Sequence, residues 1–240
     1  MAPPFGTRFS VLDHAAFAVL LLLCGFVGAL GWLDAHPQHN PWAPLSLDDP
    51  SGWATARKLV ALRSDPAECR AVLDRGAVAF AELGPAGEGE CLRADRVTLK
   101  EAPLSPASPA ATCAVFAMFE RWRRQIVEPA ARELLGASVA QIEHLGTYSC
   151  RRLYGRAEGR WSEHSQGNAI DIAAFVLSDG RRIVVLRDWK GTGEEAEFLR
   201  RVRDGACQSF STVLSPDYNE AHADHLHFDQ ADRSFGGVCR

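Results

Sequence analysis

The chain lacks several features that would assign it to common protein classes. Its 26 basic residues form no long run, and its formal net charge is −4. Nucleic acid is therefore not an expected partner, because phosphate binding leaves a clustered Lys/Arg footprint. No C-x-x-C pair occurs, which argues against a zinc site built from cysteines. No internal repeat is visible, so a repeat architecture is not expected.

The composition is that of a globular protein. The 240 residues are 47% hydrophobic and 23% charged, enough for one domain of ordinary size with an appendage. The densest basic group is Arg121, Arg123 and Arg124, which lies in a helical pattern. We expect these arginines to form a solvated helix face.

An apolar segment near the N-terminus is expected to meet a membrane. Residues 15–33 carry no charge, and their number is close to the roughly 20 needed to span a bilayer. Arg8 precedes the run and Asp34 follows it, so the charge bias places residues 1–14 in the cytoplasm and the rest of the chain outside. We predict an uncleaved anchor. The alternatives are a signal peptide cleaved near residues 27–29 and a buried helix of a soluble protein.

Cysteine usage agrees with export. Beyond the apolar segment the chain has an even number of cysteines, which in an oxidising compartment predicts three disulfides. Sequence cannot choose among the possible connectivities, and we expect neighbours along the chain to pair. The expected bonds are Cys69–Cys91, Cys113–Cys150 and Cys207–Cys239.

The remaining chain divides by composition. Residues 34–55 are rich in Pro, Asp and Ser and are predicted to be a linker. Residues 56–112 form an accessory region, with a helix expected over 56–75 and a proline-punctuated loop over 102–112. Residues 113–240 carry the candidate site.

Hydrophobic periodicity predicts an α+β domain over residues 113–240. Apolar spacing favours a helix from Cys113 to Gly136, which Pro129 bends or divides. A second helix is expected over 193–205. Strands are expected over 139–145, 169–177, 181–189, 212–214 and 225–229, with a turn at 178–180 joining two of them as a hairpin. This order indicates a mainly antiparallel sheet with flanking helices, preceded by the membrane helix.

Two short stretches carry metal-ligand chemistry. In SEHSQGNAID, His164 and Asp171 lie seven positions apart with small residues between them. In AHADHLHFD, His225 and His227 lie two apart and so share a face of a strand. His164, Asp171 and His227 are therefore candidate ligands of one ion. Two histidines and one carboxylate, with a fourth position open to water, are typical of catalytic zinc.

The neighbouring residues suggest roles in hydrolysis. Zinc lowers the pKa of its bound water toward ~7. His225 then accepts the proton and passes it to the leaving amine. His222 stabilises the oxyanion or orients the base, and Asp224 fixes a histidine tautomer or serves as the alternative base. A metal that is bound but catalytically idle is the competing interpretation. Ordinary surface or core roles are expected for His14, His36, His39 and His144.

These stretches resemble known families. SEHSQGNAID and HADHLH are similar to the signatures of the zinc peptidases grouped with lysostaphin, the D-alanyl-D-alanine metallopeptidases and hedgehog. The span from Cys113 to Cys239 more closely resembles the bacterial extensin-like C-terminal domain family. The matching pieces are YSCR (148–151), SEHSQGNAIDIAAF (162–175), FLRRVRDGAC (198–207) and FSTVLSPDYNEAHADHLHFD (210–229). The resemblance implies zinc on the three candidate ligands and catalysis by His225 with His222 assisting. It also suggests that Arg151 meets a substrate carboxylate, with a structural surface arginine as the alternative.

The resemblance implies a zinc metallopeptidase that hydrolyses amide bonds of peptidoglycan stem peptides or crosslinks, as a DD- or LD-endopeptidase or carboxypeptidase. The expected location is the periplasmic side of the bacterial inner membrane, or the periplasm itself if the anchor is cleaved. Expected partners are peptidoglycan, the membrane and, as an open question, an activating envelope protein. One alternative is a non-catalytic zinc-containing wall-binding or scaffolding module, which needs no base at His225 or Asp224. Another is a hydrolase of a different periplasmic amide.

Overall fold

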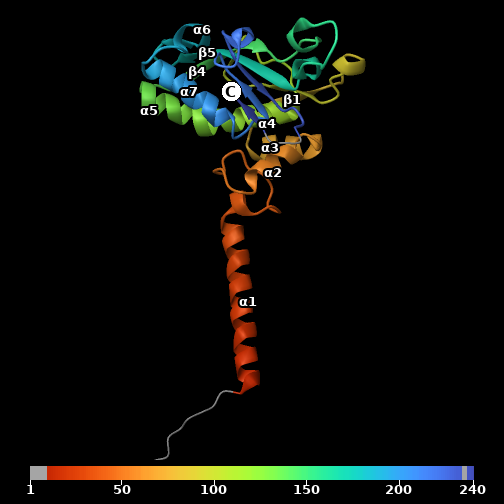
Figure 1. Cartoon of the computed structure of the whole chain (residues 1–240), viewed down its shortest axis with the longest axis vertical. Coiled ribbons are helices and arrows are strands. Elements are labelled where there is room, and N and C mark those ends of the chain that lie inside the picture. The colour runs from red at the N-terminus through yellow and green to blue at the C-terminus, as the bar shows by residue number, and fades with distance from the viewer. Residues whose placement is uncertain (1–9, 234–236) are drawn as a thin grey trace, which may run out of the picture.

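A computed structural model of the chain describes residues 10–233 and 237–240 (Figure 1). One long helix, α1 (Val11–Ala35), projects from a folded body. Ser10 and Asp13 form a capping box at its start. None of the residues of α1 is buried, and its mean hydropathy of 2.4 over 18 residues is sufficient for a membrane span. A signal sequence passes the same test. The first nine residues of the predicted cytoplasmic segment lie outside the described residues.

A seven-stranded sheet organises the body. Its strand order is β3-β4-β5-β8-β7-β9, with β6 also paired to β5. All pairs are antiparallel except β3–β4 and β7–β9, which confirms the mainly antiparallel α+β prediction. The strands are β3 (Leu104–Ser105), β4 (Val139–Gly146), β5 (Ala169–Leu177), β6 (Arg182–Val184), β7 (Thr212–Leu214), β8 (Leu226–Asp229) and β9 (Val238–Cys239).

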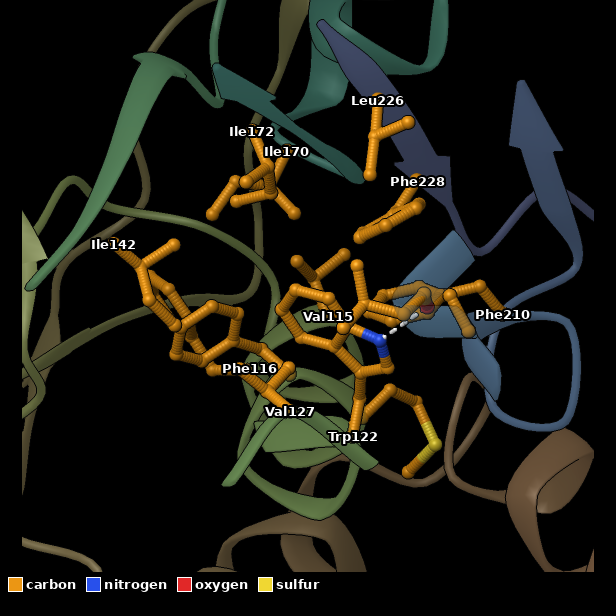
Figure 2. Close-up of a cluster of buried hydrophobic side chains, with 14 of the residues drawn as sticks. Val115, Phe116, Trp122, Val127, Ile142, Ile170, Ile172, Phe210, Leu226 and Phe228 are labelled. Carbon is orange, nitrogen blue, oxygen red and sulfur yellow. Dashed lines mark hydrogen bonds between the residues drawn. The ribbon is translucent and has the colours of Figure 1, made fainter. Parts of the chain in front are cut away.

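Helices pack against this sheet around Trp122. The expected long helix is divided into α4 (Cys113–Trp122), a π-helical turn η3 (Arg123–Val127) and α5 (Glu128–Leu135), with Pro129 in the first turn of α5. Trp122 packs on Phe175 and Phe228 at ring-centroid distances of 6.1 and 5.1 Å. Its Nε1 donates to the carbonyl of Val202 at 2.8 Å, on α7 (Glu194–Ala206) (Figure 2). Helices and sheet therefore share one apolar core.

One predicted strand ends early. The strand predicted over 181–189 ends at Val184 and continues as a helical turn, α6 (Val185–Asp188). The Asp188 carboxylate accepts the Val184 N–H at 2.7 Å and so ties the end of the strand to that turn.

The helix predicted over 56–75 is wrong as one unit. Two helices with a break between them replace it, α2 (Thr55–Ala61) and α3 (Pro66–Arg75). Pro66 cannot extend a preceding helix, and Asp65 caps the new one by accepting the Glu68 N–H. The remaining elements are small: β1 (Phe80–Leu83) pairs with β2 (Arg96–Leu99), and single 3-10 turns are η1 (Pro37–His39), η2 (Gly89–Cys91), η4 (Leu153–Gly155), η5 (Glu163–Gln166) and η6 (Glu220–His222).

The disulfide pairing is corrected in two of three cases. Cys207–Cys239 is confirmed, but the other bonds are Cys69–Cys113 and Cys91–Cys150. Cys69 lies on α3, which packs beside the start of α4, so its nearest partner in space is not its neighbour in sequence. Both bonds join the accessory region to the part of the chain after residue 112, and the two parts share one core.

Burial also corrects the solvated face expected for the arginine group. Arg121 is 2% exposed, and its guanidinium donates to the Asp49 carbonyl at 2.7 Å. Arg123 and Arg124 pair with the carboxylate of Glu120, which is itself buried. Arg121 and Arg124, which also pairs with Asp48, hold a preceding segment against α4. Within the predicted linker, Leu45 and Leu47 are buried in the domain core.

Candidate metal centre

Sheet register brings two candidate ligands together. On adjacent strands β5 and β8, Asp171 and His227 are directly opposite. Ile170 and Ile172 point into the core and are fully buried, so Asp171 lies on the other face of β5 (Figure 2). A shift of one residue on either strand would place one of the two ligands in the apolar core.

The third ligand, His164, comes from the turn η5. Ser162 precedes this turn, and its hydroxyl accepts the His164 N–H at 3.3 Å, so it braces the turn. Gly167 ends the turn with φ +69°, a conformation that a side chain would strain. The chain then enters β5, which carries Asp171. Local turn geometry thus explains why the H-x6-D spacing closes on one point.

The candidate ligand atoms are mutually close. His164 Nε2 lies 3.2 Å from Asp171 Oδ1 and 3.1 Å from His227 Nδ1. His227 Nδ1 lies 2.8 Å from the same Asp171 oxygen. The side chains of all three residues are at most 13% exposed. The structure therefore brings together the three residues expected from the sequence, in a group that could hold a metal ion.

This donor set fits zinc. Bonds of about 2.0–2.1 Å in a tetrahedron give ligand–ligand edges of about 3.3 Å, which is slightly longer than the separations found here. Two imidazole nitrogens and one carboxylate oxygen suit zinc better than magnesium or calcium, which prefer all-oxygen sites. Small outward movements of the three side chains would complete the geometry.

Asp229 supports His227 from the opposite side of the ring. Its Oδ2 lies 3.1 Å from His227 Nε2, while its Oδ1 accepts the Ala231 N–H at 3.0 Å. A carboxylate on the outer nitrogen of a ligand histidine fixes its tautomer and orientation. Sequence reasoning missed this residue, although a signal was present. The alternation that puts His225 and His227 on one face also puts Asp229 there.

The carboxylates set the charge of the centre in the metal-free protein. Burial alone would lower the pKa of His227, but its hydrogen bonds to Asp171 and Asp229 outweigh burial and raise the pKa to about 9. Burial would raise the pKa of Asp171, but hydrogen bonds to His164 and His227 hold that pKa far below its usual range. A proton on His227 thus occupies a position that a metal cation would take. Metal binding must release that proton.

His225 lies beside the three ligands with one nitrogen available. Its Nδ1 is 2.8 Å from Asp224 Oδ1, so Nδ1–H donates to the carboxylate. Its Nε2 then carries the lone pair and lies 3.6 Å from Asp171 Oδ1. Asp224 is 57% exposed in its side chain and acts on His225 rather than on the centre directly. Of its two expected roles, this geometry favours fixing the tautomer.

His222 is held by a chain of hydrogen bonds that sequence reasoning missed. Its Nδ1 lies 2.7 Å from Asn219 Oδ1, and Asn219 Nδ2 donates to the Tyr154 hydroxyl at 3.1 Å. Burial and the neighbouring His227 and His225 lower the pKa of His222 to about 4, so the ring is neutral at pH 7. With Nδ1–H donated to Asn219, Nε2 is an acceptor. This tautomer favours accepting a substrate hydrogen bond over stabilising an oxyanion.

Tyr154 contacts Asn219 from the turn η4. It has φ +57°, a left-handed conformation that is uncommon for a non-glycine residue and often marks functional sites. Its loop is tied at both ends: the Cys91–Cys150 disulfide lies just before it, and Arg152 pairs with Trp161 across it. No sequence motif predicts this contact, because it joins segments more than sixty positions apart.

The centre opens into a cleft of about 330 Å³. Arg151, the residue expected to meet a substrate carboxylate, lines this cleft together with Arg160 and Arg233. Trp161 and Tyr218 add aromatic surface to the lining. The segment around residues 150–165 lies at the end of the body away from α1 (Figure 1). The cleft can therefore receive a ligand that combines negative charge with apolar groups.

Comparison with known proteins gives one match. Residues 67–240 match the family model described as extensin-like protein C-terminus. The match begins within the predicted accessory region and so includes both disulfides that tie that region to the rest. No curated protein and no solved structure matches the chain.

Proposed function

The chain belongs to the extensin-like C-terminal family, and from that premise we propose that it is a zinc-dependent hydrolase of amide bonds in peptidoglycan stem peptides or crosslinks. The convergence of His164, Asp171 and His227 on one point carries the proposal. The bond cleaved would make it a DD- or LD-endopeptidase or a carboxypeptidase. We propose kinship with the lysostaphin-like zinc peptidases on the same ligand pattern.

The residues around the centre have the properties that hydrolysis requires. Bound zinc supplies a Lewis acid and brings the pKa of an attached water toward ~7. His225 Nε2 accepts the proton of the attacking water and delivers it to the leaving amine. Asp224 holds Nδ1–H of the same ring and stabilises the imidazolium while that proton is present.

The lining of the cleft supports a peptide substrate that carries carboxylates. Neutral His222 accepts a substrate N–H at Nε2, held in place by Asn219. Arg151 binds a carboxylate of the stem peptide, because a guanidinium matches the two oxygens of that group. Arg160 and Arg233 extend the same positive lining.

Features typical of exported proteins support the proposed substrate. A chain with an apolar N-terminal helix and three disulfides is suited to an oxidising compartment outside the cytoplasm. We propose that α1 anchors the protein to the inner membrane and that the body lies on its periplasmic side, where peptidoglycan is the partner.

The test uses the full chain in detergent with purified peptidoglycan. The samples are the zinc-loaded protein, the chelator-stripped protein and the stripped protein with zinc restored, and released fragments are identified by mass spectrometry. The proposal expects cleavage that the chelator removes and zinc restores, and the fragments name the bond. Zinc binding without any cleavage would instead favour a non-catalytic wall-binding or scaffolding module.

A further inference from the structure

Two tryptophans project from the segment that follows α1. We name residues 36–55 the collar; it lies between α1 and the body (Figure 1). Trp42 and Trp53 in the collar are 81% and 64% exposed, and Trp32 at the end of α1 is 47% exposed. Two of the other three tryptophans of the chain, Trp122 and Trp189, are buried. Large aromatic side chains thus gather in solvent-facing positions at one place on the molecule, where the apolar helix meets the folded body.

Ring stacking fixes the collar to the end of α1. Trp32 stacks on His36 and His39 at centroid distances of 4.5 and 5.3 Å, and His39 stacks on Trp53 at 5.7 Å. The backbone N–H of Trp53 also donates to His39 Nδ1 at 3.3 Å. Trp53 is therefore held one stacked ring away from Trp32.

The length of the apolar run sets the level of these rings. Residues 15–33 in a helix span about 28 Å at about 1.5 Å per residue. This matches a hydrocarbon core of about 30 Å, so Trp32 falls at the membrane–water interface when α1 spans the bilayer. Tryptophan is enriched at that interface because its ring is apolar and its N–H is polar. The His39 ring links Trp53 to this position, at successive centroid distances of 5.3 and 5.7 Å.

The other side of the collar is fastened to the body. Leu47 is fully buried in the domain core. Arg121 donates to the Ser51 hydroxyl at 3.1 Å, and Gln125 donates to the Asp49 carbonyl at 2.7 Å. Lys58 donates to the Pro37 carbonyl at 2.7 Å. No long free linker therefore separates α1 from the body over the described residues 35–58.

We propose that the collar is a membrane-docking surface, with Trp42 and Trp53 inserted among the headgroups of a phospholipid bilayer. The body then rests on the bilayer at a fixed height, and the segment around residues 150–165, part of which lines the cleft, lies at the far end. The collar thus holds the body in a fixed position on the bilayer and does not act as a flexible linker. This proposal is independent of the reaction that the cleft performs.

The test places the full chain in phospholipid nanodiscs. The protein is labelled with 5-fluorotryptophan, and its fluorine signals are assigned through single Trp→Phe substitutions. Nanodiscs are prepared with and without a lipid that carries a gadolinium chelate on its headgroup. We expect the chelate to broaden the fluorine signals of Trp32, Trp42 and Trp53 together. Trp122, Trp161 and Trp189 should stay sharp and serve as controls within the same molecule.

Two outcomes would overturn the proposal. If the Trp32 signal broadens while the Trp42 and Trp53 signals stay as sharp as that of Trp161, the collar does not contact the bilayer and the body is held away from it. If all three stay sharp, α1 does not place its end at the interface. Unchanged signals of the buried Trp122 and Trp189 in the Trp42→Phe and Trp53→Phe variants establish that these variants fold.

Discussion

The cleft and the collar both gather histidines and aromatic rings, but the partners of the histidines differ. In the cleft, His225 and His227 bond to carboxylates, and His225 Nε2 and His227 Nδ1 both lie near Asp171 Oδ1. In the collar, the Nδ1 atoms of His36 and His39 bond to backbone atoms, and their faces stack on tryptophan. Histidines with carboxylate partners support metal and proton chemistry. Histidines with backbone and aromatic partners act as structural spacers.

Replacing a ligand in the cleft should give the largest difference between the two regions, because only the cleft is expected to bind zinc. Asp171→Asn removes the only carboxylate of the three ligand residues and the negative charge that both ligand histidines face. We expect zinc content to fall from about one ion per chain to near zero, measured by elemental analysis after gel filtration. His39→Ala in the collar should keep its zinc. Full zinc occupancy in Asp171→Asn would contradict the assigned ligand set.

Shortening a buried side chain of the collar should cost stability without affecting zinc. Leu47→Ala leaves a cavity in the core and is expected to lower the free energy of unfolding by about 2–5 kcal/mol. Urea unfolding in detergent measures this change. Leu92→Ala is the matched control, because Leu92 is 44% exposed. An equal and small effect for both would mean that the collar is a loose linker.

Removing the outer support of His227 should weaken zinc binding but not abolish it. Asp229→Asn replaces the carboxylate on His227 Nε2 by a neutral amide, so we expect affinity to fall about 10- to 100-fold. Competition with a fluorescent zinc chelator gives the dissociation constant. Asp179→Asn, at an exposed turn, should leave it unchanged. An unchanged constant for Asp229→Asn would remove Asp229 from the centre.

The pH dependence of zinc binding is the most gradual test. His227 must lose its proton to bind zinc, and its pKa in the metal-free protein is raised to about 9. Below that pH, affinity should fall about tenfold for each unit of pH, and above it the dependence should flatten. Zinc titrations between pH 6 and pH 10 cover both sides of the His227 pKa and measure the dissociation constant at each pH. Affinity that stays flat from pH 6 to pH 9 would contradict protonation of His227.

Local patterns made the core of the site predictable from sequence. Period-two alternation in β5 and β8 and the short H-x6-D spacing confine His164, Asp171 and His227 to one face of the sheet. Long-range packing decided what was missed. The Cys69–Cys113 bond, the buried Arg121 and the Tyr154–Asn219 contact all depend on which segments pack together. Neither hydrophobic periodicity nor spacing along the chain contains that information.

The central claim is that zinc on the three ligands and a base at His225 together cleave a wall peptide. The most direct test compares rates of peptidoglycan digestion by the zinc-loaded full chain and by its His225→Ala variant, with zinc content measured in both. We predict equal zinc and a rate about 10²- to 10⁴-fold lower in the variant, because His225 transfers the proton without binding the metal. Equal rates in the two proteins, or no digestion by the zinc-loaded chain itself, would contradict the account.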